Sequence, residues 1–230
     1  MSDGGYSGFP QEGLKFFSDL KKNNNREWFQ EHKQDYIDYV QTPAQAFVEY
    51  LGAELRTFLP AIRYDSHPHR GSILRIYRDI RFSKDKTPYK THIGIHFWEG
   101  KGKKTELPGV YFYMRPEGAK LYVGLYQFPK LILLAYRNAV ADDRSGGELT
   151  DILSRVRSSG KYEIGGEHYK RVPRGFSPDN ARADLLRHNG LYGASALIEP
   201  QEICSPKLID LCVRNSKDMA LIHHWLMKIQ

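Results

Sequence analysis

The chain has 230 residues, of which 40% are hydrophobic and 13% aromatic, and its formal net charge is +7. This composition excludes a disordered protein, and the longest aliphatic run, residues 131–135, is too short to span a bilayer. Cys204 and Cys212 are the only cysteines, and no basic region followed by an apolar stretch opens the sequence. We therefore expect a cytoplasmic protein with reduced thiols and no membrane partner.

The first sixty residues predict three helices. Apolar residues recur at helical spacing within residues 10–20. Asn24 is expected to cap a second helix, with Glu27 completing a capping box. Thr42, followed by Pro43 at the first helical position, is expected to cap the third.

Beyond residue 71 the hydrophobic pattern changes to a period of two, which is typical of strands. We predict strands over residues 74–82, 92–98, 110–115, 121–126 and 191–198. The fold class is therefore α+β, with an antiparallel sheet of about five strands and helices from both chain ends packed on it. The simplest arrangement of the early strands is a meander.

The second half of the chain predicts helices, a hairpin and a basic loop. Helices are expected over about 129–140, 148–156 and 177–190, a hairpin around Gly165-Gly166, and two closing helices after Ser205. No linker is evident, so we expect a single domain over residues 1–230, with a disordered start at 1–8 and a helical extension at 196–230.

The alternation divides the predicted sheet into two faces. One face is aliphatic and must be covered by helices. The other carries Arg, Asp, His, Tyr and Trp, and we expect it to form the floor of a cleft in which Gly94 and Gly124 leave room for a ligand or a close-packed helix. The alternative is a second core layer under helices, with the tyrosine hydroxyls satisfied at its edge.

The most basic stretch of the chain covers residues 75–90. Six cations face only Asp79 and Asp85 there, which leaves a local charge of +4. We expect Asp79 to hold Arg75 and Arg81 by charge-assisted hydrogen bonds, and the following loop to complete an anion cradle with its three lysines, Lys84, Lys86 and Lys90. The alternative is a structural Arg–Asp network beneath a solvated loop.

Arg78 lies on the aliphatic face by parity. A lone buried guanidinium would cost several kcal/mol, on the order of the penalty for an unpaired ion. We therefore expect Arg78 to pair with a carboxylate of an N-terminal helix or to emerge at a sheet edge.

The histidines do not indicate a metal site. His92 and His96 would lie about 13 Å apart on a strand, too far to share one ion. His67 and His69 lie near no carboxylate motif. The sequence also has no P-loop, dinucleotide fingerprint or nucleophile elbow, so we expect no metal and no cofactor. Whether the protein is an enzyme stays open; Asp79 and His92 are the candidate acid/base residues.

A second basic cluster covers residues 170–178 and includes Arg174. It ends where the helix over 177–190 is predicted to begin. Free amides and the dipole at a helix N-terminus favour an anion, so this loop is a second candidate anion site.

Four motifs stand out in the chain: FP with FF within residues 9–17, NNREWF at 24–29, RDIRFSKDKTPYKT at 78–91 and PRGF at 173–176. Together they resemble a widespread family called domain of unknown function 2461. The resemblance covers about residues 9–195 and implies a cytosolic single-domain protein. It implies no activity, cofactor or catalytic residue.

Three functional hypotheses follow. In the first, an anionic, phosphate-containing small molecule binds on the polar sheet face. The ligand-binding residues would be Arg75, Tyr77, Arg81, Lys84, Lys86, Lys90, Tyr111, Tyr113, Tyr122 and Arg174, with Trp98 in the aromatic wall.

In the second hypothesis, the same basic and aromatic face binds nucleic acid, because bases stack on Tyr and Trp while Lys and Arg follow the phosphates. In the third, the protein is a non-catalytic scaffold that would expose a large apolar patch. The sequence does not predict an oligomeric state.

Overall fold

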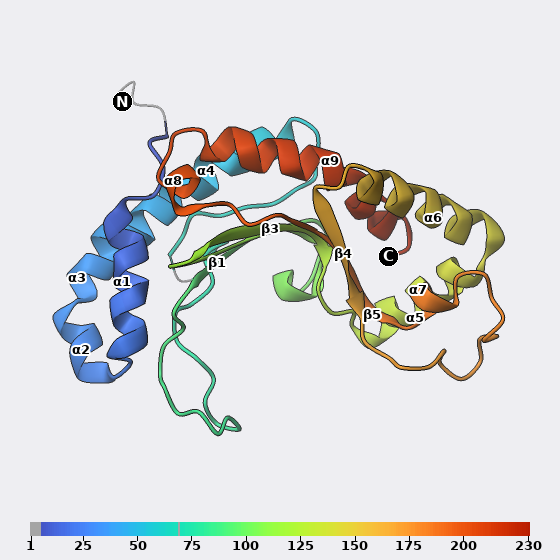
Figure 1. Ribbon diagram of the computed structural model, residues 1–230, viewed down its shortest axis with the longest axis horizontal. Coiled ribbons are helices and arrows are strands. Elements are labelled where there is room, and N and C mark those ends of the chain that lie inside the picture. The colour runs from blue at the N-terminus through green and yellow to red at the C-terminus, as the bar shows by residue number, and fades with distance from the viewer. Residues whose placement is uncertain (1–5, 69) are drawn as a thin grey trace. The chain divides into compact units, whose positions relative to one another are not determined.

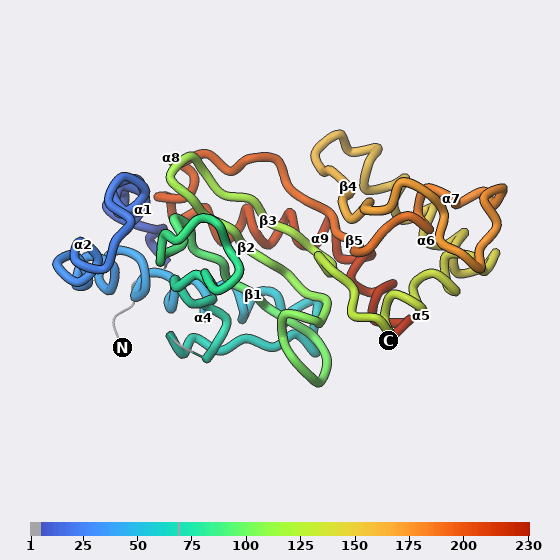
Figure 2. Tube along the Cα trace, turned by 90° about the horizontal axis from the view of Figure 1, so that it is seen from below, coloured from blue at the N-terminus to red at the C-terminus, as the bar shows by residue number. Residues whose placement is uncertain are grey.

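The computed structural model describes residues 6–68 and 70–230 (Figure 1). Within them lies a five-stranded antiparallel sheet in the order β1-β2-β3-β5-β4. The first three strands form a meander and lie side by side in both views (Figures 1 and 2). The predicted α+β fold is thus confirmed. The strands are β1 (Ile93–Trp98), β2 (Gly109–Arg115), β3 (Gly118–Leu125), β4 (Tyr162–Glu167) and β5 (His188–Ser195).

Helices precede, interrupt and follow the strands. No helix of the described residues combines the length and the apolar content needed to cross a membrane. The α-helices are α1 (Gln11–Lys22), α2 (Arg26–Glu31), α3 (Lys33–Tyr36), α4 (Thr42–Arg56), α5 (Lys130–Ala141), α6 (Asp143–Ser158), α7 (Ala183–Leu186), α8 (Pro200–Ile203) and α9 (Leu208–Lys228), with a π-helical turn η1 (Ile37–Gln41) and a 3-10 turn η2 (Lys104–Glu106).

The chain divides into two compact units. The first contains the chain up to Phe97, with Tyr111–Lys120 and Leu197–Arg214. The second contains Trp98–Val110, Leu121–Ala196 and Asn215–Gln230. Of the predicted disordered start, residues 1–5 lie outside the described residues, whereas the ring of Tyr6 packs 5.9 Å from that of Phe47.

An aromatic core joins α4 to β1 and β2 in the first unit. The ring centroid of Phe47 on α4 lies 4.6 Å from that of Phe112 and 6.5 Å from that of Phe97. Phe9 packs 5.5 Å from Phe47, and its amide donates to the carbonyl of Ile203 at 3.0 Å. The aliphatic sheet face is therefore covered by an N-terminal helix, as predicted.

Two of the predicted helix caps are wrong. Asn25, not Asn24, caps α2, because its side chain accepts a hydrogen bond from the amide of Trp28 at 2.9 Å. Thr42 caps nothing, since Gln41 before it is already helical and η1 runs directly into α4. Pro43 is tolerated because it lies in the first turn of α4, directly after the π-helical turn η1, where the α-helical hydrogen-bond pattern restarts.

Three later elements also differ from prediction. Residues 162–172 contain no hairpin: β4 pairs with β5, which comes from another part of the sequence. Helix α6 already begins at Asp143, because Asp142 caps it through the amide of Ser145 at 2.7 Å. Of the helix predicted over 177–190 only α7 forms. The chain before it turns so that Arg182 donates to the last carbonyls of α5, from Nε to Val140 at 2.7 Å and from Nη2 to Ala141 at 3.3 Å.

The second unit buries polar side chains with specific partners. The Tyr136 hydroxyl donates to the carbonyl of Leu185 at 3.0 Å, and Trp225 Nε1 donates to that of Ser145 at 3.1 Å. His223 has no exposed surface, and its Nε2 lies 2.8 Å from Glu99 Oε2. Its Nδ1 has no hydrogen-bond partner among the described residues. Burial lowers the pKa of His223, and Glu99 only partly opposes this.

This buried histidine makes stability depend on pH. Because the pKa of His223 in the folded chain lies below its ordinary value of about 6.5, the unfolded chain takes up the proton first, and stability is lost as pH falls below that value. We expect His223→Gln to lose less stability than wild type between pH about 7.5 and about 5. Urea unfolding at both pH values measures this, and equal losses would contradict it.

Candidate functional site

The basic stretch forms a protruding arm, which we define as residues 75–92. In Figure 1 it is the teal loop that points away from the sheet. Its two limbs meet at a bridge between Tyr77 and Tyr89, where the Arg78 amide donates to the Pro88 carbonyl at 2.9 Å and the Lys90 amide donates to that of Ile76 at 2.8 Å. The arm therefore belongs to the first unit.

The prediction that residues 74–82 form a strand of the sheet is wrong. A single isolated bridge, Tyr77–Tyr89, forms there, because the opposing limb contains Pro88, which has no N–H to donate to a ladder. The predicted aliphatic face also fails along the arm. Ile76 is buried, but Phe82 at the tip is 95% exposed.

Asn24 and Phe29 anchor the arm to the N-terminal helices. The Asn24 side-chain amide donates to the carbonyl of Tyr89 at 2.9 Å and accepts from its amide at 3.0 Å. Phe29 stacks on the Tyr89 ring with centroids 4.1 Å apart, and Tyr77 lies 5.3 Å from the same ring. This contact explains why NNREWF and TPYK occur together as motifs: each supplies half of the anchor.

Two ion pairs neutralise charge toward the tip. Arg81 donates to both carboxylate oxygens of Asp79, at 3.0 and 2.7 Å, and this guanidinium lowers the pKa of Asp79 to about 2. Arg78 Nη1 donates to Asp85 at 2.6 Å and to the carbonyl of Thr87 at 3.1 Å. Arg78 is therefore paired, but with a carboxylate of the arm itself rather than one of a helix.

Asp79 holds one arginine instead of the two expected. No ion pair joins it to Arg75, although the Arg75 charge contributes slightly to its lowered pKa. With a pKa of about 2, the Asp79 carboxylate is a weak base near neutral pH. Its observed contacts make it a partner of Arg81.

The base of the arm gathers cations that form no ion pair with a carboxylate of residues 6–68 or 70–230. Lys90 is half-buried, and its Nζ donates to the backbone carbonyl of Arg75 at 2.9 Å. Burial and the Arg75 charge both lower the pKa of Lys90. Burial, then Lys90, lowers the pKa of His92 to about 4, so its imidazole is neutral at pH 7. The Tyr113 ring lies 4.6 Å from His92. We call Arg75, Lys90, His92 and Tyr113 the base cluster.

Tyr111 fills the space that Gly94 was predicted to leave for a ligand or a helix. A side chain at Gly94 would collide with the Tyr111 ring and hydroxyl. The buried His96 lies 6.3 Å from the same ring. This part of the polar face is therefore filled by side chains, in agreement with the alternative prediction of a second core layer.

The remaining site candidates lie elsewhere. Lys84 and Lys86 are exposed near the tip, where Lys86 Nζ donates to the carbonyl of Ile80 at 3.0 Å. Tyr122 and Arg174 belong to the second unit. Tyr122 packs edge-on against Tyr192, and Arg174 is exposed in a loop where the predicted helix N-terminus does not form.

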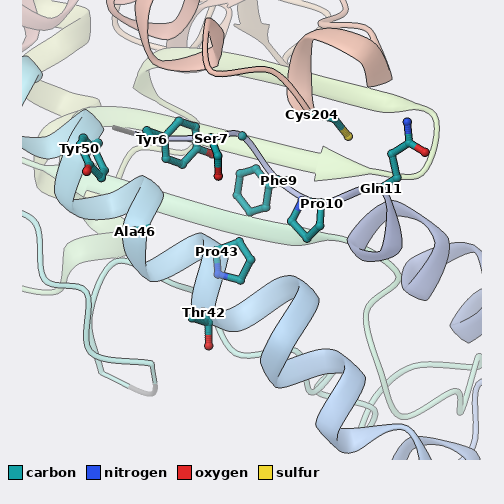
Figure 3. A pocket seen from close by; sticks show the side chains of 11 residues that line it. Tyr6, Ser7, Phe9, Pro10, Gln11, Thr42, Pro43, Ala46, Tyr50 and Cys204 are labelled. Atoms are coloured by element: carbon teal, nitrogen blue, oxygen red, sulfur yellow. The ribbon is translucent and has the colours of Figure 1, made fainter. Parts of the chain in front are cut away.

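The first unit also contains an open groove of about 660 Å³ (Figure 3). Its lining carries no charged side chain, so it is poorly suited to the predicted anion. Sequence reasoning missed it because its walls come from three distant segments. The lining residues are Tyr6, Ser7, Gly8, Phe9, Pro10, Gln11, Thr42, Pro43, Ala46, Tyr50 and Cys204.

Metal and thiol chemistry have no evident centre in the parts that the structure describes. Residues 6–68 and 70–230 contain no group of three or more His, Cys, Asp or Glu that could hold an ion. His69 lies outside them. Cys204 and Cys212 are free, and burial raises the pKa of both thiols.

A family profile described as "Conserved hypothetical protein (DUF2461)" matches residues 12–225. The matched range includes both halves of the anchor, the whole arm and most of α9. It also extends beyond the residues that carried the resemblance. No curated protein matches the chain.

Removing the anchor should destabilise the first unit. In Asn24→Ala the amide and carbonyl of Tyr89 lose their partners, and we expect a loss of about 1–3 kcal/mol in unfolding free energy. Urea unfolding measures this. The control is Asn138→Ala, an exposed residue of α5. Equal stability of the two variants would contradict a role for the Asn24 amide.

The proximity of Lys90 and His92 can be tested separately. Lys90→Ala removes a like charge, so we expect the pKa of His92 to rise from about 4. A pH titration of the His92 ring by NMR measures this shift. Lys207→Ala, an exposed cation of the same unit, should leave the His92 titration unchanged.

Proposed function

We propose for this chain, which belongs to the DUF2461 family of conserved hypothetical proteins, that the base cluster binds a phosphate-type anion. The carrying observation is the geometry of the cluster, in which Lys90 Nζ donates to the backbone carbonyl of Arg75 at 2.9 Å and His92 follows two residues later. Burial, then the Arg75 charge, lowers the pKa of Lys90, and burial, then the Lys90 charge, lowers that of His92. Among the described residues no carboxylate forms an ion pair with Arg75 or Lys90.

An external anion would relieve the repulsion between these like charges. Lys90 is half-buried and so loses hydration, and a counter-ion compensates both this loss and the like charge of the exposed Arg75. Arg75 offers a planar fork that fits two oxygens of a phosphate, and Lys90 keeps donors beyond the one given to the Arg75 carbonyl. A tetrahedral oxyanion fits these donors better than a larger apolar ligand.

Two neutral groups extend the donor set. His92, with a pKa of about 4, can donate one ring N–H without adding charge at neutral pH, and the Tyr113 hydroxyl can donate a second hydrogen bond beside it. The same low pKa makes His92 a weak general base. The proposal is therefore one of binding, with His92 as a ligand-contacting group.

Sulfate is a suitable probe because it stays a dianion across the useful pH range. We expect the wild-type chain to bind it, and Arg75→Ala to weaken binding at least about tenfold, the loss of one charge-assisted hydrogen bond. Isothermal titration calorimetry measures both. Lys207→Ala is the matched control, and an equal loss in that variant would show only a response to net charge.

The proposed site also predicts a pH dependence. A bound anion favours protonated His92 and so raises its pKa above the value of about 4 in the free chain. By linkage, sulfate affinity should rise as pH falls from about 6.5 toward 4. Calorimetry at three pH values on wild type and His92→Gln tests this. If sulfate affinity rose equally in His92→Gln, a group other than His92 would be taking up the proton, which would contradict the prediction.

A further inference from the structure

The tip of the arm exposes an aromatic ring to solvent. Phe82 is 95% exposed, far beyond what its apolar surface favours, and lies five residues from Tyr77, which is 51% exposed. The Arg81 guanidinium lies 5.8 Å from the Phe82 ring centroid. Arg81 thus lies over one face of the ring, and the high exposure of Phe82 leaves room for a ligand that stacks on the ring.

Cations without carboxylate partners accompany these rings along the arm. Both aspartates of the arm are already engaged, Asp79 by Arg81 and Asp85 by Arg78. Lys84 has no ion-pair partner among the described residues, and Lys86 contacts only a backbone carbonyl there. The charge that these ion pairs do not neutralise is therefore positive along the arm, from its tip to the base cluster.

We infer that the arm binds single-stranded nucleic acid, with bases stacked on Phe82 and Tyr77 and backbone phosphates held by Lys84, Lys86 and the base cluster. The inference rests on the proposed anion site for one phosphate position. Five residues of extended chain span up to about 16 Å, which leaves room for several bases stacked at about 3.4 Å. Base–aromatic stacking is tolerant of sequence, so no base preference is required.

The distribution of the contacts favours a nucleic acid over a membrane or a protein. A bilayer surface would meet the tip alone, whereas exposed aromatic and cationic groups continue from Phe82 past Tyr77 to Arg75. A protein partner would be expected to cover a broader apolar patch than one phenylalanine. Repeated phosphates and flat bases match an arm that alternates charge and rings.

The test is fluorescence anisotropy of a labelled single-stranded oligonucleotide of about twelve mixed-sequence nucleotides, at about 50 and 150 mM salt. We expect Phe82→Ala to weaken binding about tenfold, within the range for one lost stacking contact, and Phe82→Trp to restore it. Phe82 is exposed, so folding should be preserved. Tyr126→Ala, a 79% exposed ring of the second unit, is the control and should bind as wild type does.

Charge is tested in the same assay. Each lost phosphate contact to a single strand reduces the salt slope by about 0.7, so Lys84→Ala with Lys86→Ala should reduce it by about 1.4. Sulfate binding by the base cluster should not change in Phe82→Ala. Loss of sulfate binding in Arg75→Ala thus reports on the proposed function, and loss of oligonucleotide binding in Phe82→Ala reports on the inference.

Three outcomes would overturn the inference. The first is sulfate binding without oligonucleotide binding at low salt, which would leave the proposed function standing alone. The second is equal oligonucleotide affinity of wild type and Phe82→Ala. The third is Phe82-dependent binding to vesicles of mixed phosphatidylcholine and phosphatidylserine without oligonucleotide binding, which would make the tip a membrane contact.

Discussion

The arm depends on one side-chain amide. Asn24 gives the backbone of Tyr89 both of the hydrogen bonds that a neighbouring strand would give it. The opposing limb cannot replace them, because its bonds at the Tyr77–Tyr89 bridge go to Pro88 and Lys90, and the backbone groups of Tyr89 point to the other side. With Phe29 stacked on Tyr89, this contact fixes the second limb against the N-terminal helices. The positions of Lys90 and His92, which follow directly in the chain, are thereby fixed as well.

The ion pairs divide the arm into a tip, where arginines are neutralised, and a base, where cations remain available to bind an anion. Toward the tip, Asp79 and Asp85 each hold an arginine, and these exposed pairs organise the loop more than they stabilise it. At the base, Arg75 and Lys90 have no carboxylate of their own among the described residues. Six cations that look alike in sequence thus divide into structural and available groups, and only the available ones can recognise an anion.

The same division limits Asp79 and His92 as acid/base groups. Asp79 is held by Arg81, and His92 is too desolvated to be a strong base. Binding needs only donors and charge, and the base cluster supplies both. The groove lined by Tyr6, in contrast, carries no charged side chain and is poorly suited to an anion.

Sequence reasoning succeeded where a pattern is local and repeated. The period of two in β1, β2 and β3 identified these strands, and the family motifs identified the residues on which the arm is built. It failed at residues 74–82, where the same alternation continues without a partner strand able to complete the ladder. The predicted helix cap at Asn24 was also wrong, because the side chain that caps α2 is that of the next residue, Asn25.

Periodicity, motifs and composition were sufficient to predict the α+β class, the family and the excess of cations in residues 75–90. They could not predict which cations are paired, that Phe82 is exposed, or that Tyr111 fills the space beside Gly94. The ion pairs depend on how the arm folds back on itself, the exposure of Phe82 on the lack of a segment that covers it, and the Gly94–Tyr111 contact on the packing of two strands. Alternation along one segment carries no information about what lies opposite it.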